Sequence, residues 1–156
     1  MSGVNHCGAY VEHLQAEHHR LNCALLEIRH QFGELNRSMQ PQAALAGIIE
    51  RLEDLLKKLR SHFAEEEAGG CLEEAVARCP SLGPQSRDLM GEHPQLARAL
   101  EQLLEGMKSR AANEDAWQQQ FEAFATDLKT HECAENRLLQ VGLGGGATDY
   151  DVEGNE

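Results

Sequence analysis

The sequence predicts an all-α protein, an antiparallel up-down-up-down four-helix bundle, and two observations carry this expectation. The 156 residues are rich in Leu, Ala, Glu, Gln and Arg and poor in β-branched residues, a composition that favours helices. Apolar residues also recur at steps of three and four along four long segments, which is the spacing of one helix face. Short breaks between these segments favour reversal of the chain, so consecutive helices are expected to pack antiparallel.

The first two predicted helices are separated by a clear break. It covers residues 38–41, where Pro41 is suited to the start of a helix. The pair Gly69-Gly70 ends the second helix. Apolar stripes mark the four helices over residues 14–35, 45–59, 89–107 and 117–138.

The second half of the chain has a longer connection before its two helices. In residues 71–86, Pro80 and Pro84 prevent a continuous helix, although a short helix at 72–78 fits. The third helix is expected to start near residue 87. Asn113 is suited to cap the fourth helix.

The length suits one domain of roughly 100–200 residues, and the bundle is expected to cover residues 8–141. Residues 142–156 are glycine-rich and acidic and have little to bury, so a disordered tail is expected there.

Charge and cysteine usage exclude several partners. The formal net charge of −12 disfavours nucleic acid and anionic membranes, which require clustered Lys and Arg. No apolar run approaches the roughly 20 residues of a membrane span, and no secretory leader is apparent. The five scattered cysteines are typical of reduced thiols in a cytoplasmic protein. Helix rise would hold Cys71 and Cys79 roughly 12 Å apart, too far for a disulfide.

Each apolar stripe contains a histidine on its core-facing line, and in two helices a glutamate follows four residues later on the same line. Burying an unpaired polar group costs on the order of 2–7 kcal/mol, so such a set requires compensation. The six residues are His18, His62, Glu66, His93, His131 and Glu135.

Helix lengths place these six residues in one layer of the bundle. His18 and His62 each lie about 20 residues, or roughly 30 Å, from the first break. His93 and His131 each lie about 19 residues from the last break, a matching height at the same rise per residue.

Four imidazoles and two carboxylates exceed the needs of one catalytic zinc, which typically takes three protein ligands. They suit two ions that share the glutamates, each with two histidines. Mixed imidazole and carboxylate ligation with open positions favours iron, with manganese or zinc as substitutes. Two iron ions with an oxo or hydroxo bridge are therefore expected, with room for a small ligand.

Four short motifs occur in an order that resembles the hemerythrin-like, or HHE cation-binding, domain, over about residues 10–141. The resemblance implies iron ligands at the same six residues, with the two glutamates bridging, and binding of dioxygen, nitric oxide or peroxide. The motifs are Glu17-His18-His19-Arg20-Leu21, His62-Phe63-Ala64-Glu65-Glu66, Glu92-His93 and His131-Glu132-Cys133-Ala134-Glu135.

The sequence departs from the oxygen-carrying hemerythrins at two positions. Those proteins have a second histidine where this chain has Ala97, and a shorter carboxylate where it has Glu135. The missing imidazole favours reactive redox chemistry or sensing over reversible oxygen carriage. The ligand set is similar to that of iron–sulfur repair di-iron proteins, although only Cys7 represents their cysteine-rich N-terminal segment.

The expected function is thus a non-haem di-iron protein that binds or reduces a small oxidant, and an oxidoreductase if it is an enzyme. The alternatives are a non-catalytic sensor or iron-storage module, and a metal-free bundle whose histidines pair with glutamates. No catalytic acid or base stands out, and the protein partner is open. His19 could replace His18, and Glu65 or Glu67 could replace Glu66. Tyr10 could reach the mouth of the site or have a packing role. Solvated histidines are expected at His6, His13 and His30.

Overall fold

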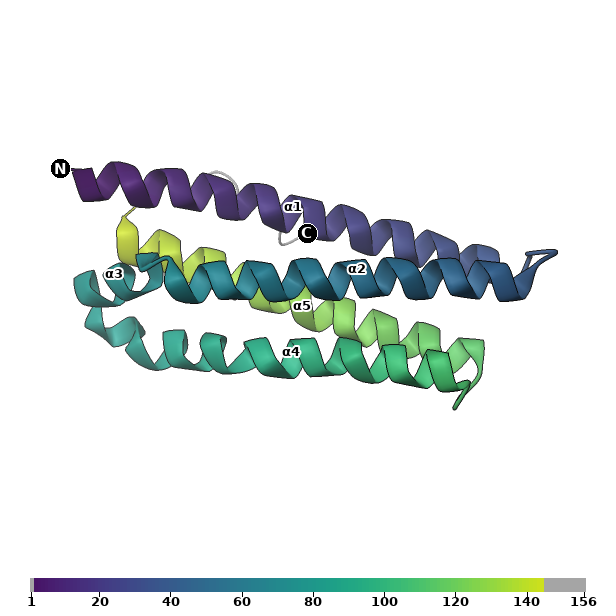
Figure 1. Cartoon of the computed structure of the whole chain (residues 1–156). Coiled ribbons are helices and arrows are strands. Elements are labelled where there is room, and N and C mark those ends of the chain that lie inside the picture. Colours follow the sequence, from purple (N-terminus) through teal and green to yellow (C-terminus); the bar gives the residue numbers. More distant parts are fainter. Residues whose placement is uncertain (1, 145–156) are drawn as a thin grey trace.

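The computed structural model describes residues 2–144, with side chains from residue 7 onward, and confirms the all-α antiparallel bundle. Four long helices run alternately up and down, and a short helix lies across one end of them (Figure 1). No helix within residues 2–144 is long and apolar enough to cross a membrane. The helices are α1 (Ser2–Leu35), α2 (Pro41–Ala68), α3 (Cys71–Arg78), α4 (Gly83–Ser109) and α5 (Glu114–Leu143), with a 3-10 turn at Pro80–Leu82.

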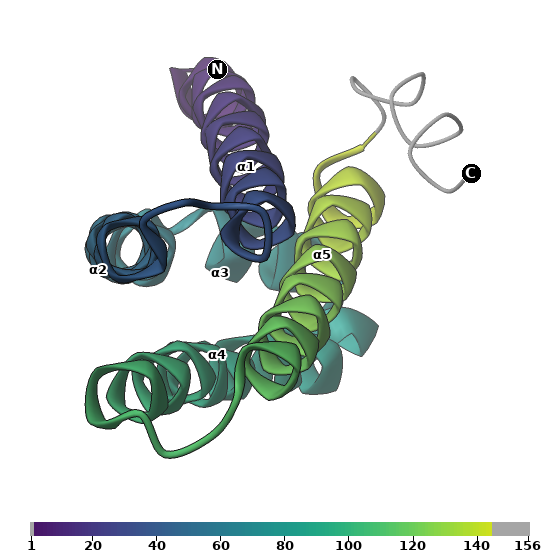
Figure 2. The ribbon, with the colours of Figure 1, turned by 90° about the vertical axis from the view of Figure 1, so that its right-hand side faces the viewer.

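The four long helices form a ring in which neighbours in the chain are neighbours in space. Helix α1 packs on α2, α2 on α4 and α4 on α5, and α5 closes the ring on α1 (Figure 2). This is the arrangement expected when short connections join antiparallel helices. Side chains from all four helices therefore meet along one central axis.

The helix ends follow the predicted signals, with one correction. Pro41 occupies the first turn of α2, and the Asn113 side chain accepts a 2.9 Å hydrogen bond from the backbone N–H of Ala116 at the start of α5. Helix α4 begins at Gly83, earlier than the start expected near residue 87. Pro84 does not delay it, because proline lacks an N–H that the first turn leaves unpaired in any case.

The last helix extends past the boundary expected at residue 141. Helix α5 includes Gly142 and Leu143, and Gly142 is buried against α3. A Cβ atom added to Gly142 would lie 2.8 Å from the Cα of Ala75, so only glycine allows this approach. Residues 145–156, where a disordered tail is expected, lie outside the described residues.

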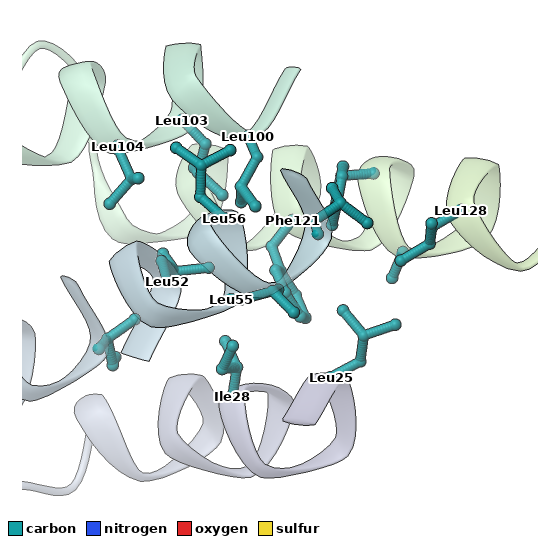
Figure 3. Packing of buried hydrophobic residues seen from close by; sticks show 14 of the residues in the cluster. Leu25, Ile28, Leu52, Leu55, Leu56, Leu100, Leu103, Leu104, Phe121 and Leu128 are labelled. Carbon is teal, nitrogen blue, oxygen red and sulfur yellow. The ribbon is translucent and has the colours of Figure 1, made fainter. Parts of the chain in front are cut away.

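The apolar core is divided into two clusters. The larger fills the end of the bundle opposite α3 and includes Phe121, Leu100 and Leu52, all fully buried (Figure 3). The smaller lies beneath α3. Between the two clusters every long helix carries a polar residue on its inner face, so a polar layer separates them. The smaller cluster consists of Cys7, Leu14, Cys71, Leu72, Ala75, Leu89, Leu138 and Leu139.

Candidate metal centre

The layer between the two apolar clusters contains all six side chains singled out in the sequence. Each helix places its residue there because helical spacing sets it between apolar neighbours: His18 lies between Leu14 of the smaller cluster and Leu21 of the larger. The six side chains converge from four helices, so the layer is a centre rather than a surface patch. Their exposed fractions are 5% for His18, 2% for His62, 2% for Glu66, 3% for His93, 2% for His131 and 0% for Glu135.

Two overlapping groups of possible metal ligands make up this centre, and each offers four ligand atoms within 4.8 Å of one another. Glu66 and Glu135 belong to both groups. His18 and His62 complete one group, and His93 and His131 complete the other. A carboxylate has two oxygens, so two shared glutamates are suited to bridge two ions.

The buried imidazole nitrogens and carboxylate oxygens of this layer are suited to bind cations. The inward Nε2 atoms of the four histidines, and both oxygens of Glu66 and Glu135, have no hydrogen-bond partner within the described part of the chain. The His62 Nε2 lies 3.1 Å from Glu66 Oε1, and the His18 Nε2 lies 3.4 Å from Glu135 Oε1, in each case without hydrogen-bond geometry. Buried polar atoms are normally paired, so this concentration of unpaired donor atoms is typical of a site that binds cations.

Carboxylates outside the layer orient three of the four imidazoles. Glu17 lies 3.2 Å from the Nδ1 of His62, Glu67 lies 2.8 Å from that of His93, and Glu92 lies 2.7 Å from that of His131. A carboxylate that accepts the Nδ1 proton leaves Nε2 free to bind a metal and fixes the ring. Sequence reasoning missed these partners because they lie one position off the core-facing line.

Burial and neighbouring charges move the histidine pKa values in different directions. Burial lowers the pKa of His18. Burial also lowers the pKa of His131, and the nearby Glu92 carboxylate does not outweigh it. Burial acts in the same direction on His62, but the carboxylates of Glu66 and Glu17 raise its pKa overall. Neutral imidazole is the metal-binding form, so the lowered pKa values favour ligation at neutral pH.

Glu132 is a seventh polar residue of the layer, and sequence reasoning did not single it out. It is 3% exposed, and its Oε2 atom has no hydrogen-bond partner among the residues that the structure describes. Burial, the largest cause, raises the pKa of Glu132 to about 7, while the charges of His18 and His62 lower it and that of Glu66 raises it. Its place directly after His131, with Leu139 seven residues on, was the available sequence signal.

One wall of the centre is aromatic. The Phe63 ring stacks on His93, with ring centroids 3.9 Å apart and an interplanar angle of 6°. The same ring meets His131 edge-on at 5.7 Å. This wall lies beside the His93–His131 pair and presents only carbon to it.

The structure separates the six central residues from the alternatives in the sequence. His19 is exposed and contacts Cys23 at 3.6 Å, while Glu65 is exposed and lies 2.9 Å from His13. Glu67 contacts the outer nitrogen of His93 rather than the centre. None of these three therefore competes for the places of His18 and Glu66.

The remaining candidates divide by exposure. The side chains of His13 and His30 are 48% and 76% exposed, as expected for solvated histidines, and the side chain of His6 lies outside the described ones. The Tyr10 ring packs near Gly69, and burial raises the pKa of its hydroxyl.

The closest cysteine contact joins α1 to α3. The Sγ atoms of Cys7 and Cys71 lie 2.7 Å apart, and Cys7 Sγ lies 2.8 Å from Glu74 Oε2. Cys79, at the far end of α3, contacts Ser81 at 3.4 Å. The neighbour of Cys71 is therefore Cys7, a pairing that no sequence spacing indicated.

Fold and site together describe a four-helix bundle with a buried group of histidines and glutamates that could hold metal cations. The family model of the hemerythrin HHE cation-binding domain matches residues 9–140. The chain belongs to this family, which confirms the resemblance drawn from its motifs. Neither the curated proteins nor the solved structures gave a match.

Proposed function

We propose that this chain is a non-haem di-iron protein that binds or reduces a small oxidant: dioxygen, nitric oxide or peroxide. The observation that supports it is the pair of ligand groups sharing Glu66 and Glu135, each with its own two histidines. This set gives each ion about four protein donors and leaves coordination positions open. Mixed imidazole and carboxylate ligation of this kind favours iron, with manganese or zinc as substitutes.

The surrounding residues limit what can reach the centre. The six proposed ligands are at most 5% exposed, so access is restricted to a small molecule. Phe63 and the flanking leucines exclude bulk water and favour a weakly polar ligand. Bound iron would supply Lewis acidity and reducing electrons, and the chain supplies position, charge and a dry environment.

Metal content tests the proposal directly. Protein loaded with ferrous iron without oxygen should hold two ions per chain and absorb in the near ultraviolet after oxidation. His131→Ala should lose metal and stability, because the remaining ligands stay buried and unpaired. His30→Ala is the matched control, since its side chain is 76% exposed on α1. Less than one ion per wild-type chain would contradict the proposal.

The reaction is tested by mixing reduced protein with peroxide or nitric oxide. Consumption of many equivalents per centre would support an oxidoreductase. Stoichiometric binding without turnover would support a sensor or an iron-storage module instead. His131→Ala should show neither turnover nor stoichiometric binding, and His30→Ala should behave as the wild type does.

A further inference from the structure

Two buried cysteines form a contact in the smaller apolar cluster, at the end of the bundle that contains α3. Cys7 on α1 is 6% exposed and Cys71 on α3 is 0% exposed, and their Sγ atoms lie 2.7 Å apart. No other two cysteine sulfurs make such a contact within residues 7–144, since Cys23 and Cys79 contact other residues. These two thiols therefore form a pair that the proposed metal centre does not use.

The backbone around α3 fixes the position of Cys71. This residue is the first of α3 and directly follows Gly70, whose φ of 78° is a conformation that favours glycine. Farther along α3, Ala75 packs closely against Gly142 of α5. A disulfide bond is about 2.05 Å long, so a small movement of the two side chains would bring their sulfurs to bonding distance.

A carboxylate lies beside the pair and connects it to solvent. The Cys71 thiol donates to the Sγ of Cys7, and the Cys7 thiol donates to Oε2 of Glu74 at 2.8 Å. The Glu74 side chain is 33% exposed, so a proton that it accepts from Cys7 can pass to water. Burial, together with these contacts, raises the pKa of Cys7 to about 12, so the pair stays reduced unless an oxidant persists.

We propose that Cys7 and Cys71 are a redox-active dithiol, which hydrogen peroxide converts to an intramolecular disulfide. Cys7 passes its proton to Glu74 and its sulfur attacks peroxide, so an S–O bond forms and the O–O bond breaks. The hydroxide that leaves takes the proton from Glu74 and becomes water. The Cys71 sulfur then attacks the Cys7 sulfur: the S–S bond forms, the S–O bond breaks, and hydroxide leaves as water with the proton of Cys71. The two thiols lose two electrons, and one peroxide becomes two molecules of water.

The new bond would tie α1 to α3 across the end of the bundle. Helix α3 packs mainly on α5, so the disulfide would add a covalent link to α1 that the reduced protein lacks. The bond would join positions 64 residues apart, and a cross-link of this kind stabilises a protein chiefly by restricting its unfolded chain. The reaction needs no bound metal, so the inference is independent of the proposed di-metal centre.

The test maps the disulfide in the full chain. Protein that has been reduced and freed of reductant is treated with hydrogen peroxide and a chelator, which keeps free iron from reacting. It is then unfolded, its remaining thiols are alkylated, and its peptides are identified by mass spectrometry. Wild type should give two peptides joined through Cys7 and Cys71, which a reductant separates. Cys7→Ala and Cys71→Ala should lose this product, and Cys23→Ala, an exposed cysteine removed from α1, should keep it.

Two further measurements test whether the fold directs the bond. Oxidation in concentrated urea should give mixed pairings, because the unfolded chain does not hold the two thiols together. Oxidised wild type and Cys23→Ala should melt at a higher temperature than their reduced forms, and Cys7→Ala should show no such increase. Recovery of Cys7 and Cys71 as alkylated thiols from native protein whose Cys23 is oxidised would overturn the inference and leave a packing contact. The same mixed pairings with and without urea would overturn it as well.

Discussion

The Nδ1 atom of His131 lies 2.7 Å from Oε1 of Glu92, so a half-exposed carboxylate on α4 fixes the ring of a fully buried imidazole on α5. The same relationship joins Glu17 to His62 and Glu67 to His93. Each carboxylate comes from a neighbouring helix, so the orientation of the inner donors depends on the packing of the bundle. Removing one such carboxylate should therefore weaken metal binding, although the carboxylate itself is not one of the proposed ligands.

Glu92→Ala should weaken metal binding by about 10–100-fold, because His131 loses the acceptor that holds its ring and its proton. Glu92→Gln should lose less metal affinity, since its amide oxygen can still accept a hydrogen bond from the Nδ1 proton of His131. Chelator competition measures the affinity. Glu105→Ala, an exposed carboxylate on the same helix, is the control. Equal affinity of Glu92→Ala and the control would show that the contact does not orient the ligand.

Removing metal should lower the melting temperature by a large margin. The apoprotein keeps inner donors without partners, whereas a cation that binds only the folded state stabilises it by about 4 kcal/mol at a thousandfold excess over its dissociation constant. Calorimetry with and without ferrous iron measures the difference. His131→Ala should show little response to iron. A wild-type melting temperature that does not depend on metal would mean that the donors pair among themselves.

Gly142→Ala should destabilise the protein by about 1–3 kcal/mol, because the new methyl group overlaps the backbone of Ala75 and forces α3 away from α5. Gly91→Ala is the matched control, since a Cβ there would meet no described atom within 4 Å beyond its own helix. That control should be neutral or stabilising, as alanine is the better helix former. Urea denaturation of both variants measures the difference. Equal stabilities would show that α3 is not held at this point.

Cys23 should react with a thiol-specific alkylating reagent well before Cys7. Burial, together with the contacts to Cys71 and Glu74, raises the pKa of Cys7 to about 12. The reactive form is the thiolate, so at pH 8 very little of Cys7 is available. Mass spectrometry of peptides from briefly labelled native protein gives the order. Labelling of Cys7 at the rate of Cys23 would contradict the buried contact.

The bundle and the six central residues were predictable because both follow from helical periodicity. A polar residue at a core position breaks the stripe visibly, and helix rise then sets its depth, as for His18 and His62. The short helix after Gly70 and the cap at Asn113 followed from local signals of the same kind.

The remaining features depend on contacts that no single stripe encodes. The carboxylates at Glu17, Glu67 and Glu92 act on helices other than their own. The burial of Glu132 depends on how α5 packs against the neighbouring helices. The approach of Cys7 to Cys71 requires α3 to fold over the bundle end, and residues 71–82 give no signal of that direction.

The polar layer also determines how the protein can come apart. It interrupts the apolar interior between the cluster under α3 and the larger cluster beyond, so without a cation little hydrophobic contact couples the two ends. Without a cation, we therefore expect the end that contains α3 to open locally and exchange its amide hydrogens faster than the rest of the bundle. A cation bound in the polar layer would couple the two ends, so metal binding is expected to make the end that contains α3 more rigid.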